Sequence, residues 1–225
     1  MPHNRSNNRS SRGEANRQAL LEAALEEFAR HSYYGANNRD IAARANANQA
    51  LIGYHFGGKE GLYLAVFEQI RERIRARVGP ALDSIEQLIT DDAVLATEQW
   101  LEHLLQLVTS LVRLFADNKM KTSAQLILQE QQDPTEAFDI LYQGFMARAL
   151  ATTTQLVQKI RPDLNSQAAA LMVAAILGQT LVFRAARSTF LRHLEWQDIG
   201  PDELTILEQC VTNNVRNLLH CKDSP

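Results

Sequence analysis

The sequence predicts an all-α protein, and three observations support this fold class. From Asn16 onwards, apolar residues recur at spacings of three and four, the period of a helix that buries one face. No segment shows a convincing alternation of apolar and polar residues, which would be typical of a half-buried strand. The predicted helices follow one another with short connections, as in helical bundles.

Composition favours a protein of the cytoplasm. The 225 residues allow one domain or two small ones, and 45% apolar with 22% charged residues is ordinary for a globular chain. Two cysteines, Cys210 and Cys221, cannot make a disulfide framework and fit a reducing compartment. The opening residues lack the apolar segment of a secretion signal. The most apolar stretch, residues 168–178, is shorter than the about 20 residues that span a bilayer, so we expect no membrane partner.

The first predicted elements are an arm and a long helix. Residues 1–13 are rich in Asn, Ser and Arg without apolar periodicity, which predicts a mobile basic arm. Two roles are open for this arm: a solubilising tail, or a segment that contacts DNA phosphates or the minor groove. The helix from Asn16 carries an apolar stripe that includes Leu20 and Phe28. Gly35 is expected to end this helix, because glycine tolerates left-handed backbone.

Two very short helices joined by a tight turn follow. Asn37 is the expected N-cap of the first, Asn38–Ala45. Asn46 is one of the few non-glycine residue types that accept the left-handed conformation of a turn. Asn48 is the expected N-cap of the second short helix, Gln49–His55.

The rest of the chain is also helical in period. A fourth helix starts after Gly57-Gly58, and Pro80 is expected to close it. Asp133 and Pro134 match the preferences for an N-cap and a first helical position. The later helices are predicted at Trp100–Phe115, Ala124–Gln129, Asp133–Ile160, Asn165 or Ser166 to Leu194, and Gly200–His220.

Two short helices with a tight turn, after a longer first helix, describe a helix-turn-helix unit. In such a unit the second short helix lies in the DNA major groove, so Gln49 is placed to bond adenine. Tyr54 and His55 can reach phosphates, and Lys59 lies in the first turn of the next helix, where backbone N–H groups favour a phosphate. Residues 1–60 carry a net charge of +2 and residues 61–225 one of −5, which also points to an anionic partner at the N-terminal end.

Three segments carry a resemblance to a known family. Residues 37–42 (NNRDIA), 45–48 (ANAN) and 52–62 (IGYHFGGKEGL) resemble the DNA-binding domain of TetR-family repressors over about residues 16–70. Residues 129–135 (QEQQDPT) and 178–184 (GQTLVFR) resemble the CecR branch of that family. The resemblance implies a basic arm at 1–13, a DNA-binding domain at 14–60, and a ligand-binding and dimerisation domain at 61–225. The implied DNA contacts are Asn37, Asn38, Arg39, Asn48, Gln49, Ala50, Gly53, Tyr54, His55 and Lys59.

Four residues depart from the family pattern. Asn37 replaces Thr and Asn46 replaces Gly, and each substitute can perform the same local role. Gly58 replaces a capping Ser at little cost. Gly53 replaces a Tyr, which removes one phosphate contact and weakens the recognition helix by up to about 1 kcal/mol relative to Ala. Gly53 therefore leaves an alternative function open, that of a helical protein-binding adaptor that has lost affinity for DNA.

The resemblance also implies a homodimer, a palindromic operator and a small-molecule effector that releases the DNA. Residues 168–177 are apolar all round, which fits a dimer interface or, alternatively, a helix central within one monomer. Effector pockets are mostly apolar with a few polar groups. Ligand candidates of that kind are Trp100, His103, Arg113, Gln129, Tyr142, Phe145, Met146, Gln179, Phe183 and Arg184, with Gln106 and Gln125 of similar character.

Other chemistry has little support in the sequence. The six His residues and two Cys show no metal-ligand spacing, so no metal or cofactor is expected. No Gly-rich phosphate loop or Ser/His/Asp signature supplies a catalytic group, which makes an all-α enzyme the weakest alternative. The sequence therefore predicts a cytoplasmic, ligand-responsive transcriptional regulator, most readily a repressor, whose partners are operator DNA, a second copy and an effector.

Overall fold

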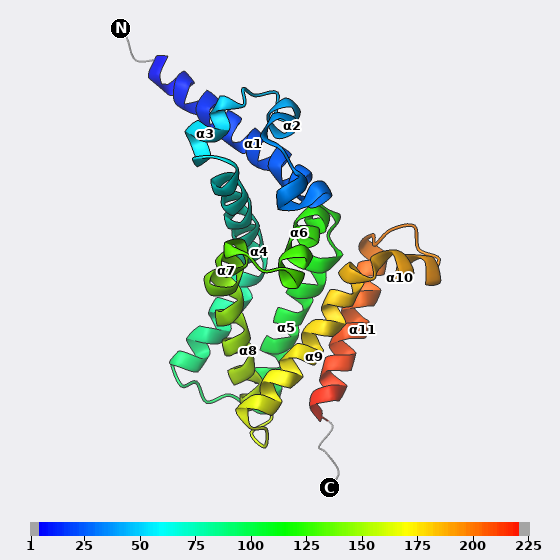
Figure 1. Ribbon diagram of the computed structural model, residues 1–225. Coiled ribbons are helices and arrows are strands. Elements are labelled where there is room, and N and C mark those ends of the chain that lie inside the picture. Colours follow the sequence, from blue (N-terminus) through cyan, green and yellow to red (C-terminus); the bar gives the residue numbers. More distant parts are fainter. Residues whose placement is uncertain (1–4, 221–225) are drawn as a thin grey trace. The chain divides into compact units, whose positions relative to one another are not determined.

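The computed structural model describes residues 5–220, with side chains from residue 12 onwards, and every regular element among them is helical (Figure 1). The all-α prediction is confirmed. The elements are α1 (Arg5–Gly35), α2 (Asn38–Arg44), α3 (Ala50–Phe56), α4 (Lys59–Thr90), α5 (Thr97–Ala116), η1 (Asn118–Met120), α6 (Lys121–Gln132), α7 (Glu136–Leu141), η2 (Tyr142–Met146), α8 (Ala147–Ile160), α9 (Ser166–Ala185), α10 (Arg187–His193) and α11 (Pro201–His220).

The helices form two compact units. Among the described residues, the first unit comprises 5–72 and 122–142, and the second comprises 73–121 and 143–220. This division differs from the predicted one, in which the DNA-binding domain ends at residue 60 and the ligand-binding domain begins at residue 61. The start of α4 belongs to the first unit because the Tyr63 ring packs edge-on against Phe28, with 4.8 Å between the ring centroids.

The first unit is built around the straight part of α1. The apolar stripe predicted there is buried, with Leu20 and Phe28 fully enclosed. Ile41 of α2, Ile52 of α3 and Leu62 of α4 are also at most 1% exposed. Each short helix therefore contributes a buried aliphatic side chain to one shared core, which holds the helix-turn-helix in place although helices of seven residues are marginal by themselves.

Helix α1 differs from the prediction at its start and agrees with it at its last residue. It begins at Arg5, so residues 5–13 are helical rather than an irregular arm, and residues 1–4 lie outside the described range. At the other end the helix stops at Gly35 as predicted, but the positive φ lies at Ser32 and not at Gly35, with φ 57° and ψ 177°.

Helix α4 and helix α7 also differ from the prediction. Helix α4 continues through Pro80 to Thr90, because a proline removes one backbone donor while buried Leu82 and Ile85 continue the apolar face. Helix α7 starts at Glu136 after Thr135, whose hydroxyl accepts the Ala137 N–H, so Asp133 is not the N-cap. The single helix predicted from Asp133 to Ile160 is instead α7, the π-helical turn η2 and α8.

In the second unit, α5 packs against α8, α9 and α11, and α8 packs against α9 (Figure 1). The predicted stripe on α5 forms the core of this unit, with Leu101, Leu104 and Val108 at most 1% exposed. Asn165 is the N-cap of α9 as predicted, since its side chain accepts the Ala168 N–H at 2.9 Å. The helix predicted to reach Leu194 is broken after Ala185, and α10 is a separate helix.

Helix α9 is unusual because much of its apolar surface is open. Leu171 is 66% exposed, and small residues on the same side, among them Ala174, Ala175 and Gly178, are exposed as well. By length and composition alone this helix is apolar enough to cross a membrane, and 28% of its most apolar window is buried. No other helix of the second unit covers this apolar face of α9 within the described residues.

Two arginines bind the C-terminal end of α5. Arg184 donates to the carbonyl oxygens of Phe115 and Asp117 at 2.8 and 2.6 Å, and Arg187 donates to that of Ala116. Burial lowers the pKa of the Arg184 guanidinium, and the neighbouring Arg187 charge acts in the same direction. Carbonyl oxygens at a helix C-terminus carry partial negative charge, so the cations compensate them there.

Candidate DNA interface

The local geometry of the helix-turn-helix follows from its asparagines. The Asn37 side chain accepts the Asp40 N–H at 2.9 Å and caps α2, and Asn48 accepts the Ala50 N–H at 2.8 Å at the start of α3. Between the helices, Asn46 has a φ of 49°, which confirms the left-handed conformation predicted for it. Asparagine therefore supplies both caps and the turn in this unit.

An ion-pair cluster fastens α2 to α1. Arg44, in the last turn of α2, contacts Glu26 at 3.0 Å and Glu27 at 3.5 Å. Glu27 is 5% exposed and also lies 3.5 Å from His31. Since a buried carboxylate requires partners, the cluster fixes the angle at which α2 leaves α1.

The residues predicted to contact DNA lie mostly at the surface. Tyr54 is 81% exposed, which is uncommon for an aromatic side chain in a packed unit. Asn38, His55 and Lys59 are half-buried, and the Asn38 amide oxygen is buried without a hydrogen-bond partner within the described structure. The exposed members of the predicted set are Asn37, Arg39, Asn48, Gln49, Ala50, Gly53 and Tyr54.

Lys59 begins α4 directly after two glycines in left-handed backbone. Gly57 has a φ of 75° and Gly58 one of 130°, so the predicted break between the helices occurs there. The first backbone N–H groups of α4 lack intrahelical acceptors, and together with the Lys59 ammonium they form a suitable phosphate site. The Lys59 Nζ also lies 4.9 Å from the centroid of the Tyr33 ring.

Gly61 allows the chain to make this sharp change of direction. A Cβ atom at Gly61 would lie 1.8 Å from the carbonyl oxygen of Phe56, far closer than two such atoms can approach. By contrast, a Cβ at Gly53 would meet no atom within 4 Å. Gly61 is therefore required by packing, whereas Gly53 leaves a gap on the exposed side of α3.

Three aromatic or basic residues near this surface were not in the predicted set. Tyr34 is 83% exposed, and Tyr33 lies beneath Lys59. Arg17 of α1 lies over the Phe56 ring at 5.3 Å. Their sequence signal was weak, because Arg17 follows a polar segment and the two tyrosines precede the motif by only a few residues.

The geometry described here defines a helix-turn-helix DNA-binding unit followed by a helical C-terminal domain. Residues 20–66 match the bacterial regulatory proteins of the tetR family, and residues 101–221 match the C-terminal domain of the HTH-type transcriptional dual regulator CecR. The chain belongs to the TetR family and carries a CecR-type C-terminal domain. It is a DNA-binding transcriptional regulator, and not an enzyme.

Individual relatives agree with this assignment. The chain is 27% identical to the dual regulator CecR of Shigella flexneri, over 92% of this chain and 93% of that protein. It is 44% identical to the regulatory protein RaaS of Mycobacterium tuberculosis, over 29% of this chain and 30% of that one. The solved structure of AibR in complex with isovaleryl coenzyme A and operator DNA has a TM-score of 0.62 and 14% identity, covering 89% and 97% of the two chains, which shows a shared fold.

The effector candidates in the second unit occupy different surroundings. Trp100 and Phe145 are buried, and His103, Met146, Gln179 and Phe183 are half-buried. Arg113 is exposed and contacts Glu208 at 2.7 Å, a pairing that raises its pKa. Arg184 is buried, but its partners are backbone carbonyls and not a carboxylate. In the first unit, Tyr142 is exposed and Gln129 donates to the Ala29 carbonyl.

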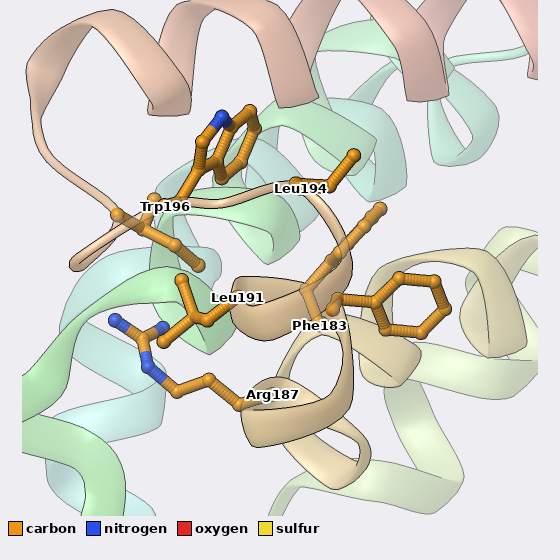
Figure 2. Close-up of a pocket in the computed structure, with 7 residues that line it drawn as sticks. Phe183, Arg187, Leu191, Leu194 and Trp196 are labelled. Atoms are coloured by element: carbon orange, nitrogen blue, oxygen red, sulfur yellow. The ribbon is translucent and has the colours of Figure 1, made fainter.

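A small hollow lies beside α10 in the second unit, and Figure 2 shows the side chains around it. Its empty space of about 200 Å³ includes open solvent, so it is a hollow at the surface and not an enclosed ligand cavity. Phe183 is the effector candidate that lines it, together with Arg187, Phe190, Leu191, Leu194, Trp196 and Ile199.

Proposed function

We propose that this protein is a homodimeric, ligand-responsive repressor that binds a palindromic operator and is released from it by a small molecule. The observation that carries the proposal is the capped helix-turn-helix, which presents Gln49, Tyr54 and Lys59 around one exposed short helix. Recognition helices of this kind read base edges with their N-terminal residues, while neighbouring groups hold phosphates. Because its operator is chromosomal DNA, the protein would work in the cytoplasm.

The side chains divide into two roles in this proposal. Gln49 reads a base, since its amide can donate to and accept from adenine in the major groove. Lys59 and Tyr54 hold phosphates and set the position of the helix without reading sequence. Asn37, the N-cap of α2, and Arg39 within α2 would add phosphate contacts at that helix.

A second copy is the proposed partner of α9. The exposed apolar face around Leu171, Ala174 and Gly178 would be buried against the same face of the other subunit, and small residues there allow close helix approach. Ile206, which is 53% exposed on α11, would join this interface. A two-fold axis between the subunits predicts a palindromic operator with half-sites about 10 bp apart.

The effector is proposed to bind within the second unit. Its mechanism would be a shift between two conformations, one of which spaces the reading helices wrongly for the operator. To convert mostly bound into mostly free protein, the ligand has to prefer that conformation by several kcal/mol, roughly 5.5 for a change from 1:99 to 99:1.

Replacing Lys59 and Gln49 separately tests the DNA-binding proposal. Lys59→Ala should weaken binding about equally on all sequences and lower the slope of log affinity against log salt by about one. Gln49→Ala should relax the preference at one position of each half-site, at a cost of about 1–3 kcal/mol. Affinity measured at several salt concentrations on matched and mismatched duplexes separates the two effects.

A further inference from the structure

Helix α6 lies far along the chain from the helix-turn-helix, yet it makes polar contacts with α1. The amides of Gln125 and Gln129 donate to one acceptor, the carbonyl oxygen of Ala29, at 2.6 and 3.2 Å. Ala29 is 1% exposed, and it precedes by three residues the break in α1 at Ser32. Two side chains on successive turns of α6 thus hold one backbone carbonyl of α1 shortly before the break.

A second link from α6 reaches the start of α4. Glu130 is 2% exposed, and its carboxylate accepts the Tyr63 hydroxyl at 2.6 Å. It also accepts the Thr135 N–H at 2.8 Å and the Thr135 hydroxyl at 3.0 Å. Glu130 is therefore a buried carboxylate held by hydrogen-bond donors, an arrangement that is costly to disturb because removing one partner leaves charge uncompensated.

Both links converge on Tyr33. The Tyr33 ring follows the break at Ser32, and its centroid lies 5.0 Å from that of Tyr63. Tyr33 also contacts Lys59, whose Nζ lies 4.9 Å from the centroid of the Tyr33 ring. The first unit alone contains this whole sequence of contacts, from α6 through two tyrosine rings to the lysine at the start of α4.

We infer that Gln125, Gln129 and Glu130 are positioning residues for Lys59, and that Tyr33 is the aromatic platform through which they act. The inference rests on the proposed function, in which Lys59 binds a DNA phosphate. The glutamines set where α1 breaks, Glu130 fixes the Tyr63 ring, and the two together place the Tyr33 ring beneath the ammonium group. Loss of the platform leaves the Lys59 charge in place but lets its long side chain sample many rotamers.

A double-mutant cycle tests the inference with the full-length protein and the duplex enriched from sheared genomic DNA. Gln125→Ala/Gln129→Ala should weaken binding about two- to fivefold, the equivalent of one exposed cation–π contact. In a Lys59→Ala background the same pair should cause no further loss, because its effect passes through that lysine. An equal loss in both backgrounds would overturn the inference. Gln131→Ala, an exposed neighbour on α6, is the matched control and should bind as the wild type.

Conservative variants distinguish positioning from simple destabilisation. Tyr33→Phe keeps the ring and should retain affinity, whereas Tyr33→Leu should lose as much as the glutamine pair. Glu130→Gln keeps an acceptor for the Tyr63 hydroxyl and should bind DNA better than Glu130→Ala. In NMR spectra without DNA, the Lys59 side-chain resonances should lose their ring-current shift in the glutamine pair; an unchanged shift would contradict the inference.

Failure of the proposed function would look different. If the wild type retained no duplex, or if Lys59→Ala bound as well as the wild type, the phosphate role of Lys59 would be wrong. If Lys59→Ala weakened binding and the α6 variants acted independently of it, the DNA-binding role would stand and only the positioning role would fall.

Discussion

The two compact units expose different kinds of large apolar side chain. Among the described residues of the first unit, those exposed are tyrosines, Tyr34, Tyr54 and Tyr142, whose hydroxyls can bond water or a polar partner. In the second unit they are all aliphatic: Val94, Leu150, Leu171, Leu194 and Ile206.

This difference follows the partners proposed for each unit. Phosphates and base edges are polar, so a surface that binds them can remain in water when it is free. An aliphatic patch on a helix such as α9 gains most from contact with another protein surface. In the proposed dimer, the first unit keeps its polar surface free for DNA, and the apolar face of α9 in the second unit would be covered by the other subunit.

Placing a charge on α9 is expected to have the largest effect. Leu171→Glu would bury a carboxylate in the proposed interface, so the protein should become monomeric. Operator affinity should then fall by about 10²–10⁴-fold, because one half-site no longer assists the other. Sedimentation velocity and operator titration measure the two quantities. Thr189→Glu, an exposed position on α10, is the control, and an unaltered dimer in Leu171→Glu would show that α9 is not the interface.

Two glycines of the first unit are expected to respond to substitution with opposite changes in stability. Gly61→Ala should destabilise it by about 1–3 kcal/mol, because the added methyl group meets the Phe56 carbonyl oxygen and the backbone has to move. Gly53→Ala should stabilise it by up to about 1 kcal/mol, since the site is helical and open. Thermal unfolding of the two variants checks the opposite signs. A Gly61→Ala variant as stable as the wild type would mean that the α3–α4 turn is not tight at Phe56.

The break in α1 offers a smaller stabilising change. Ser32 has a positive φ with an extended ψ, a conformation that glycine adopts without strain. Ser32→Gly should therefore raise the free energy of unfolding by about 1 kcal/mol after the extra entropy of glycine is subtracted. Gly35→Ala is the comparison. Gly35 lacks a positive φ, so this position has no need of glycine and the added methyl group should not strain the backbone. Denaturant titration measures the free energy of unfolding of each variant. A Ser32→Gly variant that is less stable than the wild type would contradict the strain assigned to Ser32.

The last expected effect is confined to the alkaline range and does not concern the stability at neutral pH. Burial, the hydrogen bond to Glu130 and the Glu130 charge raise the pKa of Tyr63 above its ordinary value of 10.0. The unfolded chain releases this proton near pH 10 while the folded protein keeps it, so stability is present below pH 10 and falls above it. Tyr63→Phe should reduce that fall by about one proton, or roughly 1.4 kcal/mol per pH unit. Tyr34→Phe, the same substitution at an exposed tyrosine, is the matched control.

The sequence predicted those elements whose local chemistry decides their structure. The caps at Asn37, Asn48 and Asn165 and the left-handed Asn46 depend on one side chain and its nearest backbone, so they could be read directly. Pro80 was misread because the packing of α4 outweighs the loss of one backbone hydrogen bond.

The contacts of α6 with α1 and α4 could not be predicted, since they join residues 67 to 100 positions apart. The apolar spacing of α6 shows which face is buried, but not that Gln125 and Gln129 would share the Ala29 carbonyl. Arg113 and Arg184 both interrupt an apolar stripe in the sequence. Only the fold shows that one pairs with Glu208 at the surface and the other with backbone carbonyls.

Selection of bound fragments from sheared genomic DNA, with affinity followed against salt, tests the central claim most directly. The account predicts enrichment of a palindrome with half-sites about 10 bp apart and a steep fall of affinity with salt, because phosphates supply much of the binding. The wild type and Leu171→Glu would be compared, and only the wild type should favour the complete palindrome. Failure of the wild-type protein to enrich any sequence at low salt would contradict the account.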